Sequence, residues 1–205
     1  YLTSNYIIIC TKQGVIKKTS LKAYSRPRQN GINAINVRDG DNLIQAKLTN
    51  GDNEILLAIK SGKAIRFHEN TVRPMGRNAS GVRGIKLSDD SPDEVVGMVC
   101  VQDISETTIL VVSEKGYGKR TDVENYRVTN RGGKGVKTIN ITDKTGQLIA
   151  IKGVTDMDDL MIINKSGITI RLAVADISVM GRATQGVRLI NLRNSDSIAA
   201  VTSVI

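Results

Sequence analysis

The sequence predicts an all-β fold built from four similar units, arranged as the blades of a propeller-like array. Composition is the first reason: 205 residues include one Phe, five Tyr and no Trp, so the core must consist of Ile, Val and Leu. These aliphatic residues, two of them β-branched, favour strands. A repeat of about 50 residues is the second reason, because such periods are typical of propellers and related arrays. No apolar run approaches the roughly 18 residues of a membrane-spanning helix.

Each unit opens with a predicted hairpin. An apolar strand runs into a turn ending in glycine, and a second strand carries a cation four residues later. The four hairpins read Y-I-I-I-C-T-K-Q-G-V-I-K-K from Tyr6, I-L-L-A-I-K-S-G-K-A-I-R from Ile55, I-L-V-V-S-E-K-G-Y-G-K-R from Ile109 and L-M-I-I-N-K-S-G-I-T-I-R from Leu160. The turn glycines are Gly14, Gly62, Gly116 and Gly167. The cations are Lys18, Arg66, Arg120 and Arg171.

A second glycine-led motif and a last apolar strand complete each unit. The motif reads G-I-N-A-I-N-V at Gly31, G-V-R-G-I-K-L at Gly81, G-V-K-T-I-N-I at Gly135 and G-V-R-L-I-N-L at Gly186. The last strands are expected over 43–48, 95–101, 148–154 and 198–204. Each unit therefore offers about four short strands, typical of a propeller blade. A single small sheet cannot bury both of its faces, so the blades must stack on one another.

One domain is predicted over 1–205, with repeat units at about 1–50, 51–104, 105–155 and 156–205. The units alternate in kind. The first and third carry a tyrosine before the second motif, Tyr24 and Tyr126, whereas the second and fourth carry Met-Gly-Arg at 75–77 and 180–182. Their net charges are +6, −1, +4 and 0, so positive charge is unevenly distributed.

The overall charge of +9 indicates a polyanionic partner. The segment Arg131-Gly132-Gly133-Lys134-Gly135 is the most suggestive local feature, because glycines allow a turn to direct backbone N–H groups at one anion while the cations add full charges. An isolated sequence of this kind is equally compatible with a flexible, solvated loop. Its place in a fourfold repeat favours a phosphate-binding function.

Catalytic and metal chemistry are not indicated. Cys10 and Cys100 lie in separate apolar runs and are expected to be reduced, buried thiols. His68 is the single histidine, so a satisfied polar role is favoured over a metal site, and no catalytic motif is present. We therefore expect a binding module with no catalytic residue, no metal site and no cofactor of its own.

Three segments resemble the C-terminal domain of the A subunit of bacterial type IIA topoisomerases, DNA gyrase above all. They are K-S-G-K-A-I-R-F with V-R-P-M-G-R-N-A-S-G-V-R-G-I-K-L (60–87), G-Y-G-K-R-T-D-V-E-N-Y (116–126) and I-S-V-M-G-R-A-T-Q-G-V (177–187). The resemblance implies a β-pinwheel, whose blades exchange a strand with their neighbours and whose rim bends duplex DNA. It also implies that these are the last four of about six blades, in a fragment of a longer protein.

The gyrase signature box, Gln-(Arg/Lys)-Arg-Gly-Gly-(Arg/Lys)-Gly, belongs to the first blade of such domains. The segment 131–135 matches five of its seven positions, so we interpret it as a partly preserved loop of a later blade and an auxiliary DNA contact. The box itself is expected upstream of Tyr1. Resemblance further implies an ATP-dependent type II topoisomerase as parent, an A2B2 complex with gyrase B, ATP and Mg bound outside this segment, and a cytoplasmic, bacterial location.

Phosphate contacts through a cationic rim would position DNA without specifying its sequence. The predicted DNA-contacting residues are Lys17, Lys18, Arg26, Arg28, Arg66, Arg73, Arg77, Arg83, Lys119, Arg120, Arg131, Lys134, Lys137, Arg171, Arg182 and Arg188. Two alternatives remain at this level. One is the equivalent domain of topoisomerase IV, which acts in decatenation and senses DNA geometry; the other is a propeller that binds a protein partner. Whether the four blades close into a ring also stays open.

Overall fold

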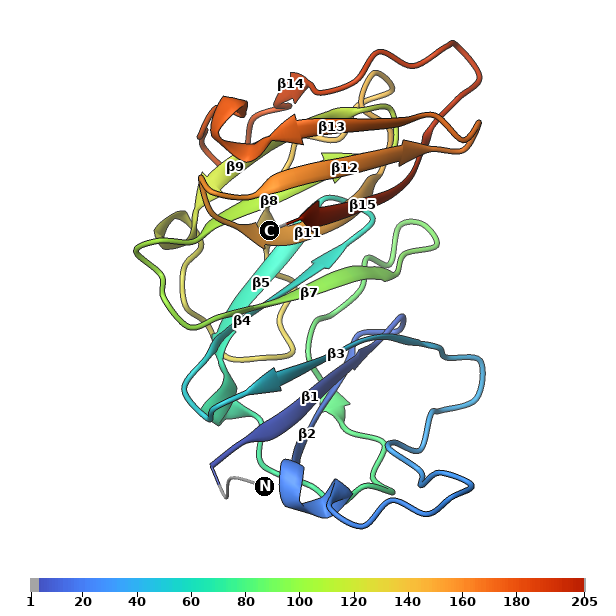
Figure 1. Ribbon diagram of the computed structural model, residues 1–205, viewed down its shortest axis with the longest axis vertical. Helices are drawn as coiled ribbons and strands as arrows, with labels where there is room; N and C mark the ends of the chain where they lie inside the picture. Colours follow the sequence, from blue (N-terminus) through green and yellow to red (C-terminus); the bar gives the residue numbers. More distant parts are fainter. Residues whose placement is uncertain (1–3, 205) are drawn as a thin grey trace.

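The computed structural model describes residues 4–204 as four antiparallel sheets that succeed one another along the chain. Three of these sheets have four strands and the last has three. Figure 1 places the first sheet and the fourth at opposite ends of the long axis, so the four described blades form an open arc. The predicted all-β fold with four repeat units is confirmed.

The strand order is the same in the first three sheets, apart from the direction in which it is read. The first sheet runs β3 (Leu43–Thr49), β1 (Tyr6–Thr11), β2 (Val15–Ser20), β6 (Val82–Arg83). The second runs β10 (Val136–Lys137), β5 (Lys63–His68), β4 (Glu54–Ile59), β7 (Val95–Val101). The third runs β11 (Leu148–Val154), β8 (Thr108–Ser113), β9 (Tyr117–Asp122), β14 (Val187–Arg188). The fourth runs β13 (Thr169–Ala173), β12 (Asp159–Asn164), β15 (Ile198–Val204).

A single 3-10 turn follows the hairpin of every blade. These turns are η1 (Leu21–Tyr24), η2 (Glu69–Thr71), η3 (Val123–Asn125) and η4 (Val174–Asp176). After η2, η3 and η4 the chain reaches the preceding blade, where Met75 N donates to Lys18 O, Thr129 N to Arg66 O and Met180 N to Arg120 O. Within residues 4–204 no helix has the length and apolarity that crossing a bilayer requires.

Each of the first three sheets is completed by a strand from the next unit. β6 pairs with β2, β10 with β5 and β14 with β9, always through two residues. The second glycine-led motif therefore forms a much shorter strand than its alternating pattern predicts. The segment 31–37 forms no strand at all, and the other three copies of the motif become strands only on a preceding hairpin.

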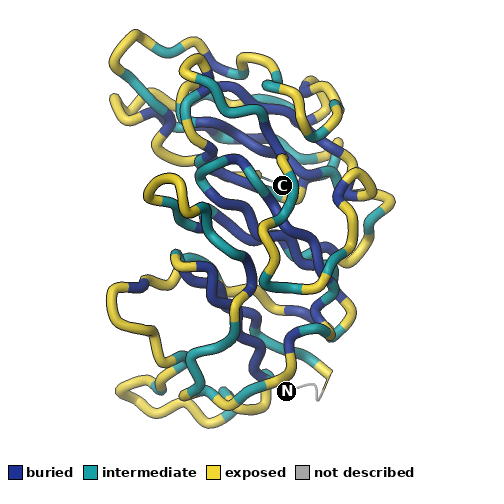
Figure 2. Tube along the Cα trace, turned by 180° about the vertical axis from the view of Figure 1, so that it is seen from behind, coloured by how far each residue is buried: buried dark blue, intermediate teal, exposed yellow. Residues whose placement is uncertain are grey.

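Three hydrophobic cores lie between successive blades rather than inside them. On β4, Leu57 packs in the core shared with the first blade, while its neighbour Leu56 packs in the core shared with the third. On β8, Val111 and Val112 divide in the same way between the second and fourth blades. Both faces of these strands are thus buried, which explains their uninterrupted apolar sequences. Figure 2 shows buried strands flanked by exposed loops along the arc.

Candidate nucleic-acid interface

Counting from the turn glycine, position 4 of the hairpin carries a cation in every blade. Three of these cations are buried: Lys18, Arg66 and Arg120 are 5%, 7% and 6% exposed. Their side chains donate to backbone carbonyls beside the 3-10 turn of the next blade. Arg66 Nη1 lies 3.1 Å from Val123 O and 3.0 Å from Tyr126 O.

The other two buried position-4 cations make comparable contacts. Arg120 Nε donates to Ile177 O at 2.9 Å, and Lys18 Nζ lies 3.4 Å from Glu69 O. Each of the two buried arginines also forms an ion pair. Arg66 pairs with Glu54 of its own blade at 3.2 Å, and Arg120 pairs with Asp156, between β11 and β12, at 2.6 Å. These cations therefore hold neighbouring blades together.

Position 3 is a lysine in the first and third blades, and both lysines are fully buried. Lys119 Nζ donates to Gly181 O at 2.7 Å, to the carbonyl of Arg182, and to the carbonyl and hydroxyl oxygens of Thr184 at 3.0 Å each. Burial lowers the pKa of Lys119 to about 8, and the positive charge of Arg182 contributes in the same direction. No carboxylate compensates this charge among the ion pairs of the described chain.

Lys17 has the same position in the first blade. Its Nζ donates to Ala34 O at 2.7 Å and to the carbonyl of Arg77. Burial lowers its pKa, and the charge of Arg77 contributes in the same direction. The expected rim location is therefore wrong for five of the predicted DNA-contacting residues, since the next blade covers Lys17, Lys18, Arg66, Lys119 and Arg120.

Arg171, at position 4 of the last blade, is the exception. Its side chain is 63% exposed and pairs with Asp159 through an Nε–Oδ2 distance of 2.6 Å. The described chain places no 3-10 turn against it, because no described blade follows the fourth. The burial of the other position-4 cations thus depends on the adjoining blade, not on the hairpin itself.

Arg77, Arg131 and Arg182 stand at one equivalent place, eleven residues after the position-4 cation, and we call them the clamp arginines. Arg131 donates from Nε to Thr71 O and from Nη1 to Arg83 O, both at 3.1 Å. Both carbonyls belong to the preceding sequence unit, Thr71 at the end of η2 and Arg83 on β6, the strand given to the first sheet. The guanidinium group therefore bridges two blades by main-chain contacts alone.

The other clamp arginines repeat these contacts. Arg182 donates from Nε to Asn125 O at 2.6 Å and from Nη1 to Lys137 O at 2.8 Å, which are the equivalent carbonyls of the third sequence unit. Arg77 retains one contact, from Nη1 to Asn33 O at 2.9 Å. None of the three forms an ion pair with a carboxylate within residues 4–204. A fixed, uncompensated positive charge thus stands at each blade junction.

Exposed cations surround these junctions. Arg83, Lys137 and Arg188 are the second residues of the exchanged strands β6, β10 and β14, and all three are exposed. Arg188 Nη2 donates to the hydroxyl of Tyr117 at 3.0 Å, a hydrogen bond that lowers the pKa of Tyr117. The remaining predicted contacts Arg26, Arg28, Arg73 and Lys134 are also exposed.

The glycine-rich loop 131–135 is organised around the second blade. Gly132 N donates to Gly84 O at 2.7 Å, and Gly133 O accepts from Lys86 N at 2.8 Å. Gly135 has φ +74°, and a Cβ there would stand 2.5 Å from Ala64 O, so only glycine fits this approach. The loop therefore serves blade packing, and Lys134 is its exposed charged side chain.

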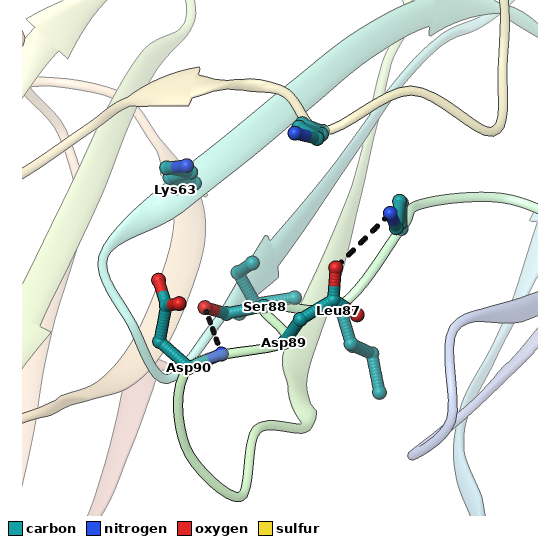
Figure 3. Close-up of a pocket in the computed structure, with 8 residues that line it drawn as sticks. Lys63, Leu87, Ser88, Asp89 and Asp90 are labelled. Carbon is teal, nitrogen blue, oxygen red and sulfur yellow. Dashed lines mark hydrogen bonds and ion pairs between the residues drawn. The ribbon is translucent and has the colours of Figure 1, made fainter.

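Lys134 also lines a cavity of about 140 Å³ together with two lysines that the sequence reasoning did not select, Lys63 and Lys86. Figure 3 shows Lys63 and Asp90 across this cavity from one another. Lys86 is paired with Asp89 at 3.1 Å, so the cavity has mixed charge. Lys63 directly follows the turn glycine of the second blade. The other three blades have no cation at this position, so the repeat does not indicate it.

The groups considered for catalysis or metal binding have structural partners. His68 Nε2 lies 2.9 Å from Asp52 Oδ1, and His68 Nδ1 accepts from Asn70 N at 3.1 Å. Tyr126 is buried and its hydroxyl bonds to Thr138, in keeping with the expected packing role. Among residues 4–204 no three His, Cys, Asp or Glu side chains gather in a way that could hold a metal ion.

The sequence profile described as "DNA gyrase C-terminal domain, beta-propeller" matches residues 5–50, 53–102, 107–154 and 158–205. The chain is 46% identical over 200 residues to the DNA gyrase A protein of Staphylococcus epidermidis and 48% identical to that of Staphylococcus aureus, strain MRSA252. These alignments cover 98% of this chain and 22% of each relative. The chain thus spans about a fifth of the length of these proteins.

Solved structures share the fold. A DNA gyrase A C-terminal domain aligns with a TM-score of 0.86 and 25% identity, covering 100% of this chain and 67% of that one. The C-terminal domain of a DNA topoisomerase IV aligns with a TM-score of 0.90 and 24% identity, covering 98% of this chain and 62% of that one. The second likeness concerns the fold alone.

Proposed function

We propose that this chain, which belongs to the DNA gyrase C-terminal domain family, binds duplex DNA and bends it along the edge formed by its blade junctions. One observation carries the proposal: each of the three junctions holds a clamp arginine that no carboxylate of the described chain neutralises. Backbone carbonyls orient these guanidinium groups without cancelling their charge. Such a group suits phosphate, because it binds oxyanions through several N–H donors at once.

The row of junctions supports bending as well as binding. Bending 20–30 base pairs costs on the order of 1–6 kcal/mol, which repeated phosphate contacts must offset. A side chain already fixed by the protein loses little conformational freedom when it meets a phosphate. Exposed cations next to the clamp arginines extend the proposed contact surface, namely Arg26, Arg28, Arg73, Arg83, Lys134, Lys137 and Arg188.

For the parent protein we propose the role of gyrase A, assembled with gyrase B into an A2B2 complex in bacterial cytoplasm. Wrapping by this domain would then bias strand passage towards negative supercoils. The chain itself would act as a binding module, with strand cleavage, ATP and Mg belonging to other parts of the complex. The length of the relatives supports this division, because the aligned region is only 22% of their sequence.

Ligation of nicked circular DNA in the presence of the domain tests the proposal. Wrapping leaves a positive linking-number shift after ligation, whereas adhesion without bending leaves none. Affinity is also expected to fall steeply with salt, since contacts to 6–10 phosphates lose roughly 10³–10⁵ between 50 and 200 mM salt. The triple variant Arg83→Gln, Lys137→Gln, Arg188→Gln removes three charges at the junctions. Its matched control is Lys22→Gln, Lys47→Gln, Lys165→Gln, which removes three exposed charges elsewhere. A flat salt dependence, or equal effects of both variants, contradicts the proposal.

The equivalent domain of topoisomerase IV is the second candidate, because a solved domain of that enzyme has the same fold. Identity of 46–48% to gyrase A proteins over 98% of the chain favours the gyrase role. The full-length protein distinguishes them, because a gyrase introduces negative supercoils into relaxed DNA and a topoisomerase IV does not. A protein-binding propeller is a further alternative, and it predicts no DNA binding at moderate salt.

A further inference from the structure

The second, third and fourth units give nearly identical strands to the blade before them, yet each strand pairs with one particular hairpin. β6, β10 and β14 read V-R, V-K and V-R, and each makes a two-residue pairing. These strands cannot by themselves distinguish one hairpin from another. Repeat proteins are prone to misassembly for this reason. The information that selects the correct neighbour must lie elsewhere in the junction.

Position 3 of the hairpin differs between successive blades. It is Lys17 in the first, Ile65 in the second, Lys119 in the third and Ile170 in the fourth. The loop that packs on it differs in step. Lys17 and Lys119 receive the Met-Gly-Arg loops of the second and fourth blades, whereas Ile65 receives the glycine-rich loop of the third.

The lysines match their loops through one carbonyl in particular. The carbonyl of Arg182 accepts from Lys119, and the equivalent carbonyl of Arg77 accepts from Lys17. Neither carbonyl has a second donor among the hydrogen bonds of residues 4–204. An isoleucine at position 3 would remove the one side-chain donor that this half-buried carbonyl has in the described chain, which weakens the junction.

The isoleucine matches its loop through packing. Ile65 is 2% exposed, and its Cδ1 lies 3.5 Å from the place that a Cβ on Gly133 would occupy. The equivalent carbonyl, that of Arg131, receives no hydrogen bond within the described chain. The distinctive contact of this loop is Gly132 N on Gly84 O, which has no equivalent at the other two described junctions, whereas Lys86 N on Gly133 O recurs there as Asn36 N on Ala79 O and Asn140 N on Thr184 O. A lysine at position 65 would bring a charge into a site that fits a methyl group.

We propose that the residue at position 3 selects the class of loop that docks on it, so that the lysine–isoleucine alternation fixes the order of the blades. Lysine selects a Met-Gly-Arg loop and isoleucine selects a Gly-Gly loop. If a hairpin paired with the blade after next, a lysine at position 3 would face a Gly-Gly loop or an isoleucine would face a Met-Gly-Arg loop. Both combinations are unfavourable, so the alternation disfavours incorrect blade orders as well as stabilising the correct one. This function is independent of DNA binding.

A double-mutant cycle on the third junction tests the pairing. One change is Lys119→Ile; the other replaces residues 180–185, M-G-R-A-T-Q, by the equivalent T-N-R-G-G-K of the third blade. Each change alone is expected to lower the thermal midpoint, and the combined variant is expected to be more stable than either. Additive losses overturn the proposal, because a lysine with only a general structural role has no preference among loops.

The exposed substitution Lys165→Ile combined with the same loop replacement is the matched control, and additivity is expected there. If Lys119→Ile alone does not fold, recovery of the fold by the combined variant is the supporting outcome. Failure of both then contradicts the proposal. Positive coupling of the same size in the control pair also contradicts it, because the recovery would then not depend on position 3.

Discussion

Arg131 and Arg182 hold their preceding blades by the same two contacts, one to the end of a 3-10 turn and one to the second residue of an exchanged strand. The loops around them differ, since Arg131 is followed by two glycines and Arg182 by Ala183 and Thr184. The clamp is therefore independent of loop class. At both junctions it fixes a half-buried charged side chain by main-chain carbonyls alone.

Arg131→Lys is expected to weaken both the junction and DNA binding. A single ammonium group cannot reproduce two contacts made by a planar fork, so at least one hydrogen bond is lost, worth about 0.5–1.5 kcal/mol. Because lysine keeps the charge, the slope of log affinity against log salt should change little while the affinity itself falls. Denaturant unfolding and binding titrations measure the two effects. Arg193→Lys is the control, and an unchanged affinity in Arg131→Lys contradicts the proposed phosphate contact.

Glu54 and Asp159 are equivalent acids on the first residues of β4 and β12, and each pairs with the position-4 arginine of its own hairpin. Glu54→Ala should cost on the order of 3 kcal/mol, because Arg66 is 8% exposed and is left without its carboxylate. Asp159→Ala should cost less than about 1 kcal/mol, because Arg171 is 63% exposed. Urea unfolding of both variants measures the difference, and equal losses contradict the assigned burial.

Lys119 predicts a pH dependence with a definite sign. Its pKa is about 8 in the folded protein, below the ordinary value of 10.5, so the unfolded chain binds more protons between these two values. Stability contributed by this group therefore rises with pH across that window. Relative to Lys119→Met, the unmodified protein should gain stability from pH 8 to 10.5. Unfolding free energies of both proteins across this range check it, and a constant difference contradicts the shift.

Two glycines of the fourth blade should respond differently to alanine. Gly186 has φ +81°, and a Cβ there would stand 2.6 Å from Gly118 O, so Gly186→Ala should cost more than about 1–2 kcal/mol. Gly181 has no atom within 4 Å of the equivalent Cβ position. Gly181→Ala should change stability by less than about 0.5 kcal/mol. Thermal unfolding measures both, and a larger loss at Gly181 contradicts the geometry.

Much of the fold could be predicted from the repeat. The last strands of the second, third and fourth units lie where the apolar pattern placed them, at Val95–Val101, Leu148–Val154 and Ile198–Val204. The hairpins and their turn glycines were equally clear, because tight turns require residues that tolerate positive φ. The short length of β10 was not predictable, since its pairing depends on a hairpin from another unit.

The candidate site was less predictable, because a repeated cation can serve a repeated interface as well as a repeated ligand. Lys119 and Lys137 lie in comparable sequence surroundings, yet one is fully buried and the other is exposed. Their exposure depends on how the next blade covers them, which local sequence does not specify. The carbonyl contacts of Arg182 could not be predicted from the sequence either, because every residue has a main-chain carbonyl and its use as an acceptor leaves no pattern in the sequence.

Because of strand exchange, the boundaries of the sheets do not coincide with the boundaries of the sequence units. A unit cut at 51–104 would include β6, which belongs to the first sheet, and would lack β10, which completes its own. Within the array each of the second and third units gives one strand and receives one. Insertion or loss of a pair of units would therefore preserve both the exchange and the alternation of junction chemistry, whereas a change by one unit would preserve only the exchange. The pair, not the single blade, is the natural increment of length for such an array.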